Sequence, residues 1–141
     1  MEKTHYSDAQ FRRDIPKLAC RIKRLGTPKN IYGFPRGGLV VAVNLSHLLN
    51  CPVILRKKQI SWRTLLVDDI CDDGKTIARL AKRTGVAIVT LFANEKRKKI
   101  RAWNCRLIYA RPKNGKLIVF PWETNESAKI DYKKKAKKKK K

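Results

Sequence analysis

Residues 64–77 read TLLVDDICDDGKTI and place four carboxylates directly after a run of apolar residues. The run at 64–68 lacks the polar alternation of a half-exposed strand, which predicts a strand buried on both faces. In this interpretation Asp68 and Asp69 end the strand. The residues that follow, CDDGKT, lead into a helix that begins near Gly74, so the stretch predicts a strand, a polar loop and a helix in succession.

Strand and helix patterns alternate on both sides of this stretch. Apolar residues recur at helical spacing from Phe11 to Leu25, with Ser7 or Asp14 as the candidate N-cap. The other predicted elements are a strand at 30–34 ending in a glycine turn, a helical face of Leu39, Ala42, Val43, Ser46 and Leu49, buried strands at 52–56 and 86–93, a helical stripe at 77–84, and short strands within 105–110 and 116–120 around a turn at 113–115. Because strands that are apolar on both faces alternate with helices, we expect an α/β fold with an open, mostly parallel sheet flanked by helices.

The length and charge of the chain set the domain organisation that we expect. A chain of 141 residues suits one domain, which we assign to 1–132. The last nine residues, 133–141, have too little hydrophobic content to bury and predict a disordered poly-lysine tail. The formal net charge is +24, and removing the eight lysines of the tail leaves +16 on the body. A body this basic favours phosphorylated metabolites, nucleic acid or an anionic membrane surface as partners, and charge alone does not choose among them.

Several classes of protein are disfavoured by what the sequence lacks. No apolar stretch approaches the roughly 20 residues that span a bilayer, and the N-terminus lacks the apolar centre of a signal peptide. The four cysteines form no C-x-x-C pair, which argues against a zinc ribbon or a dithiol redox site, and we expect core thiols in a reducing cytosol. We expect Trp62 and Trp103 to be packing or rim residues. These observations predict a cytoplasmic protein without a membrane segment.

The acidic stretch also indicates a kind of ligand. In an open parallel sheet, ligands bind at the carboxyl ends of the strands, where Asp68 and Asp69 would lie. Backbone N–H groups at the start of the helix near Gly74 would bind an anion, and Lys75 and Thr76 add a cation and a hydroxyl donor. Carboxylates that accept hydrogen bonds from sugar hydroxyls beside a loop that holds phosphate predict a sugar phosphate as the ligand.

Two other interpretations of the stretch exist. Its Gly-Lys-Thr at 74–76 copies the end of the nucleoside triphosphatase P-loop, but that motif needs a glycine where this chain has Asp69, and we reject it. The four acids could also simply cap a helix and solvate a loop, as aspartates commonly do. Two acids that directly follow a buried strand are harder to explain by solvation, so we favour a binding or catalytic site.

Three motifs of the sequence resemble those of a known family, the type I phosphoribosyltransferases. LLVDDICDDGKT resembles the family signature, IYGFPRGGLVVAVNLSHLL upstream resembles the pyrophosphate loop, and LIVFPWE downstream resembles the C-terminal base-pocket segment of the xanthine and hypoxanthine-guanine branch. The three elements follow the family's order and cover about 30–123. The resemblance implies a purine phosphoribosyltransferase that transfers the 5-phosphoribosyl group of 5-phosphoribosyl 1-pyrophosphate (PRPP) to hypoxanthine, guanine or xanthine, giving a nucleoside 5'-monophosphate and pyrophosphate.

The resemblance also implies a role for individual residues. Asp68 and Asp69 would bind the PRPP ribose and magnesium, and Asp72 would be the catalytic proton acceptor beside the incoming base. The other implied residues are Asp73, Gly74, Lys75 and Thr76 around the 5-phosphate, Arg36, Gly37 and Arg56 at the pyrophosphate, and Asn94, Leu117, Ile118 and Trp122 in the base pocket. The implied cofactor is Mg²⁺, held mainly by substrate oxygens and water, so we expect no metal-binding cluster in the sequence. A homodimer or homotetramer is implied as well.

The chain departs from the family pattern at three places. Asp73 stands where the family has Thr or Ser, the flexible hood is reduced to RKKQISWRT at 56–64, and Asn94 and Leu117 replace a base-contacting lysine and a stacking aromatic residue. The last departure leaves the preferred base open. The first two, with the lysine tail, favour an alternative: a non-catalytic PRPP- or nucleotide-sensing regulator of the same fold that binds nucleic acid through its basic body and tail.

Overall fold

The computed structural model of the chain describes residues 2–72, 79, 87–95 and 106–124. The elements in chain order are β1 (Lys3–His5), α1 (Asp8–Leu25), β2 (Asn30–Gly33), α2 (Gly37–Leu49), β3 (Val53–Ile54), the short 3-10 helix η1 (Lys57–Gln59), β4 (Thr64–Cys71), β5 (Ile88–Ala93), β6 (Leu107–Pro112) and β7 (Leu117–Val119). The loop residues Asp73, Gly74, Lys75 and Thr76, Trp103, the tail at 133–141 and, apart from the helical Arg79, the helix expected at 77–84 lie outside the described residues.

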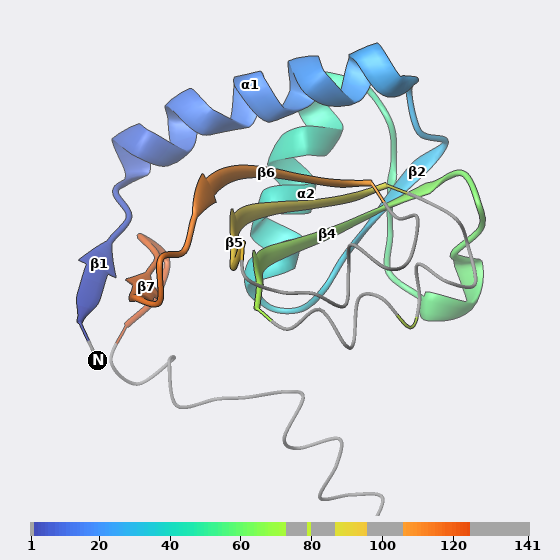
Figure 1. Cartoon of the computed structure of the whole chain (residues 1–141). Coiled ribbons are helices and arrows are strands. Elements are labelled where there is room, and N and C mark those ends of the chain that lie inside the picture. The colour runs from blue at the N-terminus through green and yellow to red at the C-terminus, as the bar shows by residue number, and fades with distance from the viewer. Residues whose placement is uncertain (1, 73–78, 80–86, 96–105, 125–141) are drawn as a thin grey trace, which may run out of the picture.

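The main sheet has five parallel strands in the order β3-β2-β4-β5-β6 (Figure 1). Its centre is β4, where Leu66 lies opposite Tyr32 of β2 and Ile88 of β5. From β2 the chain first adds β3 on one side and then returns to add β4 on the other. The predicted open parallel α/β fold is therefore confirmed, and the strand order reverses between β2 and β4.

The central strand is longer than the sequence pattern predicted. β4 continues to Cys71, so the prediction that Asp68 and Asp69 end the strand was wrong, and both lie within its second half. Pairing with β5 continues along this part of the strand, where Asp68 lies opposite Thr90 and Cys71 lies opposite Ala93. A strand covered by neighbours on both sides keeps its ladder through polar residues, which an apolar run cannot reveal.

Two other elements differ from the prediction. The buried strand expected at 52–56 is only a two-residue edge strand, β3, and the Leu55 side chain is 75% exposed. On α2 the buried residues are Gly38, Val41, Ala42, Leu45 and Leu49. Val43 is exposed, so the predicted face was rotated around the helix. Because α2 carries apolar residues almost all round, their spacing could not select the face that packs on β2 and β4.

The helix α1 begins at a capping box. The Ser7 side chain accepts a hydrogen bond from the Gln10 N–H, while the Gln10 side chain accepts one from the Ser7 N–H, which selects Ser7 over Asp14 as the N-cap. Figure 1 shows α1 running along one side of the sheet, with α2 on the same side of it. The two helices pack against each other and cover the face formed by Ile31, Leu65, Val67, Val89 and Leu91.

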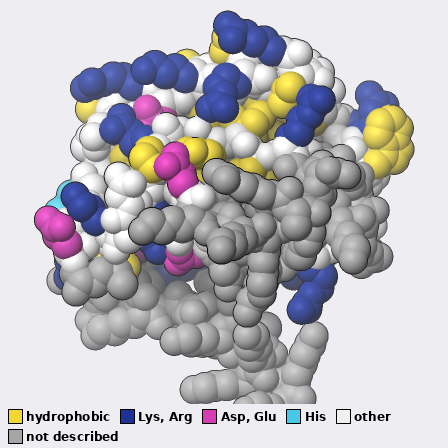
Figure 2. Space-filling model, in the orientation of Figure 1, with side chains coloured by type: hydrophobic (Ala, Val, Ile, Leu, Met, Phe, Trp, Pro, Cys, Tyr) yellow, Lys and Arg dark blue, Asp and Glu magenta, His cyan; other side chains and the backbone are white. Residues whose placement is uncertain are grey.

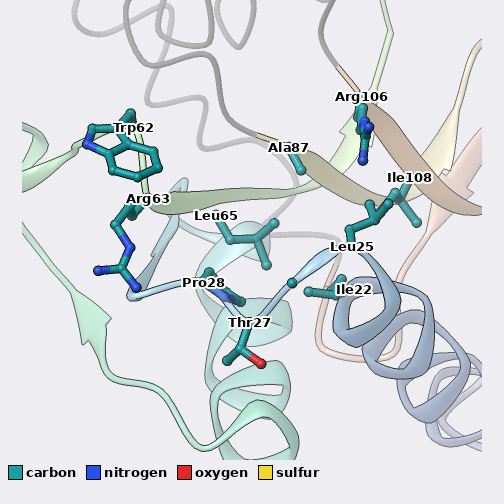
Figure 3. A pocket seen from close by; sticks show the side chains of 11 residues that line it. Ile22, Leu25, Thr27, Pro28, Trp62, Arg63, Leu65, Ala87, Arg106 and Ile108 are labelled. Atoms are coloured by element: carbon teal, nitrogen blue, oxygen red, sulfur yellow. The ribbon is translucent and has the colours of Figure 1, made fainter.

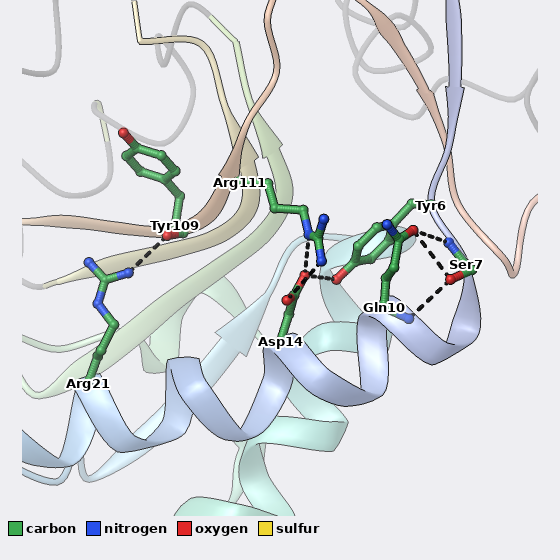
Figure 4. A network of polar contacts seen from close by, with 7 residues as sticks. All are labelled: Tyr6, Ser7, Gln10, Asp14, Arg21, Tyr109 and Arg111. Atoms are coloured by element: carbon green, nitrogen blue, oxygen red, sulfur yellow. Dashed lines mark hydrogen bonds and ion pairs between the residues drawn. The ribbon is translucent and has the colours of Figure 1, made fainter.

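A buried polar network fastens α1 to the sheet (Figure 4). The Tyr6 hydroxyl donates to Asp14 Oδ2 at 2.6 Å, and Arg111 Nε of β6 donates to the same oxygen at 2.7 Å. The Arg111 guanidinium also lies 5.7 Å from the Tyr6 ring centroid. Burial, followed by the Asp14 carboxylate, raises the pKa of Tyr6, and the hydrogen bond to Asp14 raises the pKa of Arg111. The network therefore links the chain before α1, α1 itself and β6.

A second, two-stranded sheet joins the two ends of the described chain. β1 pairs in parallel with β7, with Thr4 opposite Ile118, and Figure 1 shows this pair beyond the carboxyl end of the main sheet. The sequence predicted β7 and the turn before it but missed β1. The turn is confirmed by the left-handed conformation of Asn114 and Gly115.

The cysteines differ in their burial. Cys51 and Cys71 are buried as expected, while Cys20 is exposed, so the expectation of core thiols was wrong for Cys20, and Cys105 lies outside the described residues. Among the helices of the described residues, none is both long and apolar enough to cross a membrane.

Candidate functional site

The loop after β2, PRGG at 35–38, packs directly on the acidic part of β4. The Phe34 N–H donates to the Val67 carbonyl at 2.9 Å, and this bond holds the start of the loop against the strand. A methyl group at Gly37 would overlap Asp69 Oδ2, and one at Gly38 would lie 2.7 Å from the Val67 oxygen. A side chain at Gly38 would clash with backbone, and one at Gly37 would displace the Asp69 carboxylate, so the glycines let Arg36, Gly37 and the two acids meet where the strand order reverses.

The two adjacent carboxylates of β4 differ in burial and share a local geometry. Asp68 is buried and Asp69 is half-buried. Asp68 Oδ1 accepts from the Asp69 N–H at 2.9 Å, and Asp69 Oδ1 accepts from the Ile70 N–H at 2.8 Å. Each bond fixes a carboxylate by the backbone that follows it, which leaves Asp69 Oδ2 directed at the glycine loop.

The N-terminus of α2 begins at this same loop. Arg36 is its N-cap, and the Arg36 side chain forms no capping hydrogen bond. The first N–H groups of a helix lack intrahelical partners and, with the helix dipole, attract anions. The structure thus places a helix start suited to a phosphate or pyrophosphate beside two carboxylates suited to hydroxyl groups or a cation.

Asp72 lies one residue past β4 and forms an ion pair that the sequence did not predict. Lys113 Nζ donates to Asp72 Oδ2 at 2.8 Å, with the Lys113 side chain 13% exposed and that of Asp72 60% exposed. The family pattern places a lysine after β5, where this chain has Asn94, so Lys113 was not predicted. Its position immediately after β6 was the available signal.

The ends of three neighbouring strands converge around this ion pair. The Asn94 N–H donates to the Cys71 carbonyl at 2.9 Å, and the Lys113 N–H donates to the Ala93 carbonyl at 2.9 Å. These backbone bonds bring the residues that follow β4, β5 and β6 to one edge of the sheet. Asn94, predicted in the base pocket, is therefore a neighbour of the segment that carries Asp72.

The other predicted base-pocket residues lie on β7 and just after it. The Leu117 side chain is 44% exposed, and Ile118 is buried in the main hydrophobic cluster. The Trp122 ring stacks on Phe120 at a centroid distance of 5.0 Å and meets Phe11 edge to face at 5.3 Å. Ile118 and Trp122 thus pack into the core next to α1, and Leu117 is the exposed member of the set.

Arg56 follows the edge strand β3 and is exposed. Its N–H donates to Gln59 Oε1 at 3.3 Å, so a short turn anchors its backbone. Because β3 is parallel to β2, Arg56 leaves the sheet at the same edge as Arg36. The predicted 5-phosphate residues, Asp73, Gly74, Lys75 and Thr76, lie outside the described residues.

The donor set suits a hard cation that shares its ligands with a substrate. Within 2–72, 79, 87–95 and 106–124, no three His, Cys, Asp or Glu side chains gather into a metal-binding group. Asp68 and Asp69 supply carboxylate oxygens, which Mg²⁺ prefers, and magnesium commonly keeps waters and substrate phosphate oxygens as its other ligands. The residues present are compatible with such an ion.

Basic side chains cover the outer surface of α1. Figure 2 shows Lys and Arg gathered where α1 crosses the top of the molecule. The exposed basic residues of this helix are Arg12, Arg13, Lys17, Arg21, Lys23 and Arg24. The positive charge is therefore not confined to the tail.

Comparisons with known proteins define the fold family. No family model and no curated protein matches the chain. Among solved structures, a purine phosphoribosyltransferase from Pyrococcus horikoshii Ot3 is 26% identical with a TM-score of 0.70, over 88% of this chain and 95% of that one. A xanthine-guanine-hypoxanthine phosphoribosyltransferase from Helicobacter pylori is 19% identical with a TM-score of 0.70, over 90% and 97%.

Other matches share the fold with different printed descriptions. A hypothetical protein from Neisseria gonorrhoeae with bound ppGpp is 18% identical with a TM-score of 0.72, over 90% of this chain and 92% of that one. Orotate and adenine phosphoribosyltransferases match as well. These neighbours support a phosphoribosyltransferase and do not identify the base. The chain has the type I phosphoribosyltransferase fold and is similar to the purine branch of that family, which confirms the recognition made from its sequence motifs.

Proposed function

We propose that this protein is a phosphoribosyltransferase that transfers the 5-phosphoribosyl group of PRPP to a purine base. The observation that carries the proposal is the packing of the 35–38 loop against Asp68 and Asp69 between β2 and β4. This contact places the start of α2, where backbone N–H groups can bind an anion, beside two carboxylates of β4. Similarity to the Pyrococcus horikoshii purine phosphoribosyltransferase over 88% of the chain supports the same activity.

The reaction requires opposite charges at the two ends of the scissile bond. As the bond from ribose C1 to pyrophosphate breaks, positive charge develops on the sugar and negative charge on the leaving group. In the proposal, Asp68 and Asp69 accept hydrogen bonds from the ribose hydroxyls and face the developing positive charge. Because both carboxylates are oriented by backbone N–H groups, they need little rearrangement when the substrate binds.

The pyrophosphate would bind at the start of α2. The N–H groups near Gly37 and the Arg36 side chain stabilise negative charge there, and Arg56 adds a second cation from the neighbouring strand. Asp68 and Asp69 would also hold Mg²⁺ together with substrate oxygens. When bound, the ion would neutralise part of the pyrophosphate charge. The 5-phosphate is assigned to the segment Asp73, Gly74, Lys75 and Thr76.

The base would approach the edge formed by the residues after β4, β5 and β6. Asp72 would accept the proton that the base nitrogen loses as it bonds to C1, and Lys113 would hold the Asp72 carboxylate in place. Asn94 can donate to or accept from an exocyclic group of the base, and Leu117 offers an exposed apolar surface at the rim. Hypoxanthine, guanine and xanthine are the proposed substrates.

The test is a base panel. Purified protein is incubated with Mg²⁺, PRPP and each of hypoxanthine, guanine, xanthine, adenine and orotate, and nucleotide and pyrophosphate are measured. The proposal requires product with at least one of the first three bases and loss of that product in Asp68→Asn and Asp72→Asn. Absence of product with every base, or unchanged rates in both variants, contradicts it. A preference for adenine or orotate would overturn only the assignment of the base.

A second function, a regulator that senses PRPP or nucleotides and binds nucleic acid, is favoured by the row of exposed cations on α1. The Neisseria gonorrhoeae protein of the same fold with bound ppGpp is a further precedent for nucleotide binding. Under this alternative the chain binds nucleic acid with steep salt dependence and forms no product. If a variant truncated after residue 132 binds no nucleic acid, the tail alone explains the binding.

A further inference from the structure

A cavity of about 440 Å³ lies at the end of the main sheet where the strands begin (Figure 3). The candidate site lies at the other end. The apolar surface of the cavity includes Ile22 from α1, Leu65 at the start of β4 and Ile108 in β6. Trp62 and Arg63 lie on one side of the cavity in Figure 3, and Arg106 lies on the other. Ala87, which precedes β5, lines it as well, so four segments that are remote in sequence line one open pocket.

The side chains at the mouth combine an aromatic ring with positive charge. Trp62 is 74% exposed, and the Arg63 guanidinium carbon lies 5.8 Å from the centroid of its ring. Such a cation–π contact orients the guanidinium without neutralising it. Within the described part of the chain, neither Arg63 nor Arg106 forms an ion pair, and no acidic side chain lines the cavity. Apolar side chains and two exposed arginines therefore line the same pocket.

We propose that this cavity is a second ligand site that binds a nucleoside phosphate. The planar base packs on the apolar residues and Trp62, and the phosphate is bound by Arg63 and Arg106. An uncharged apolar ligand would leave both guanidinium groups without a partner, whereas inorganic phosphate would use neither Trp62 nor the apolar surface. The volume falls within the roughly 300–1,000 Å³ of small-molecule sites.

The proposed site is separate from the catalytic one. It lies at the amino ends of the strands, whereas Asp68, Asp69 and Asp72 lie towards the carboxyl ends. Its occupancy therefore does not depend on phosphoribosyl transfer, and the two proposals can fail independently. The same base and phosphate could also belong to a nucleic acid strand, so the experiment compares a free nucleotide with an oligonucleotide.

The test uses the full chain and calorimetric titration with GMP and AMP in the absence of magnesium. Trp62→Ala, Arg63→Gln and Arg106→Gln are compared with Asp68→Asn and with Arg13→Gln, which removes an exposed arginine of α1 outside the cavity. Folding of every variant is checked by its thermal unfolding midpoint. We expect each cavity substitution to weaken the binding of at least one nucleotide by about tenfold or more, because each removes a charged hydrogen-bond donor or a stacking surface.

Asp68→Asn and Arg13→Gln should leave that binding event intact. Binding that is lost in Asp68→Asn and unchanged in the three cavity variants would overturn the proposal, as would the absence of any binding. Inorganic phosphate binding as tightly as GMP would also overturn it, since the base would then contribute nothing. An oligonucleotide that binds more than about tenfold tighter than GMP, and is weakened by the same three substitutions, would replace the free nucleotide as the occupant.

Discussion

Lys113 Nζ lies 2.8 Å from Asp72 Oδ2 and joins the end of β6 to the end of β4, across 41 positions of sequence. The Lys113 side chain is largely buried while that of Asp72 is exposed, so the ammonium group has less freedom to move than the carboxylate it holds. A carboxylate that must accept a proton from an incoming base needs a defined orientation. The ion pair supplies one and makes Lys113 a positioning residue of the proposed reaction.

Replacing Lys113 tests this role. Lys113→Met should lower kcat about tenfold with little change in KM for PRPP, because Asp72 loses its fixed orientation while the pyrophosphate end is untouched. Steady-state kinetics with PRPP varied at saturating base measures both constants. Lys113→Arg should retain part of the kcat that Lys113→Met loses. In a protein that already carries Asp72→Asn, adding Lys113→Met should lower kcat only slightly further. A rise in KM for PRPP at unchanged kcat would contradict the role.

Neutralising the paired acids tests the ribose end of the site. Asp68→Asn and Asp69→Asn should each lower kcat/KM by about 10²–10³, since an amide keeps the shape of the side chain and removes the charge that faces the sugar. Nucleotide formation is the measurement. Asp8→Asn is the matched control, because it breaks an exposed ion pair with Arg12 on the outer surface of α1. Equal losses in all three variants would point to a general effect on folding.

Adding one methyl group tests the close packing of the loop on β4. Gly37→Ala would overlap Asp69 Oδ2 and force the loop and the carboxylate apart. A displacement of about 1 Å can lower the rate of an enzyme reaction about 10²-fold, so we expect a loss of that order in kcat/KM for PRPP. Leu48→Ala, at the exposed far end of the same helix, is the control. Wild-type kinetics in Gly37→Ala would show that the loop can move without consequence.

The network around Asp14 predicts how stability depends on alkaline pH. Tyr6→Phe removes a buried hydrogen bond and should lower the free energy of unfolding by about 1–2 kcal/mol at neutral pH. The folded-state pKa of Tyr6 is raised above its ordinary value, so the unfolded chain loses this proton first as the pH rises. The contribution of Tyr6 is complete below pH about 10 and declines above it.

Denaturant unfolding of wild type and Tyr6→Phe between pH 7 and pH 11 measures this effect. The difference in unfolding free energy between the two proteins should shrink above pH about 10, because only the wild type carries the titrating hydroxyl at residue 6. Tyr109→Phe is the matched control for losing a tyrosine hydroxyl, since the hydrogen bond from Tyr109 to Glu95 is exposed. At pH 7 it should lower the free energy of unfolding by less than Tyr6→Phe does. Parallel curves across the whole range would contradict the assignment to Tyr6.

The sequence predicted the parts of the fold that depend on local pattern. Continuous apolar runs identified β4 and β5, and the period of apolar residues identified α1, because burial on one or two faces leaves a signature within a single element. Prediction failed where the pattern was ambiguous. The largely apolar α2 gave no unique face, and β1 is three residues long and gains its strand structure from pairing with β7.

The candidate site divides in the same way. The sequence alone determined that Asp68, Asp69 and Asp72 belong to a buried strand and the residues after it, since residue type and spacing are local properties. Only the tertiary structure decided that Gly37 packs on Asp69, that Lys113 pairs with Asp72, and that Trp62, Arg63 and Arg106 share a cavity. The physical reason is that strand order and long-range packing, which bring distant residues together, are set by the burial of the whole core rather than by any one segment.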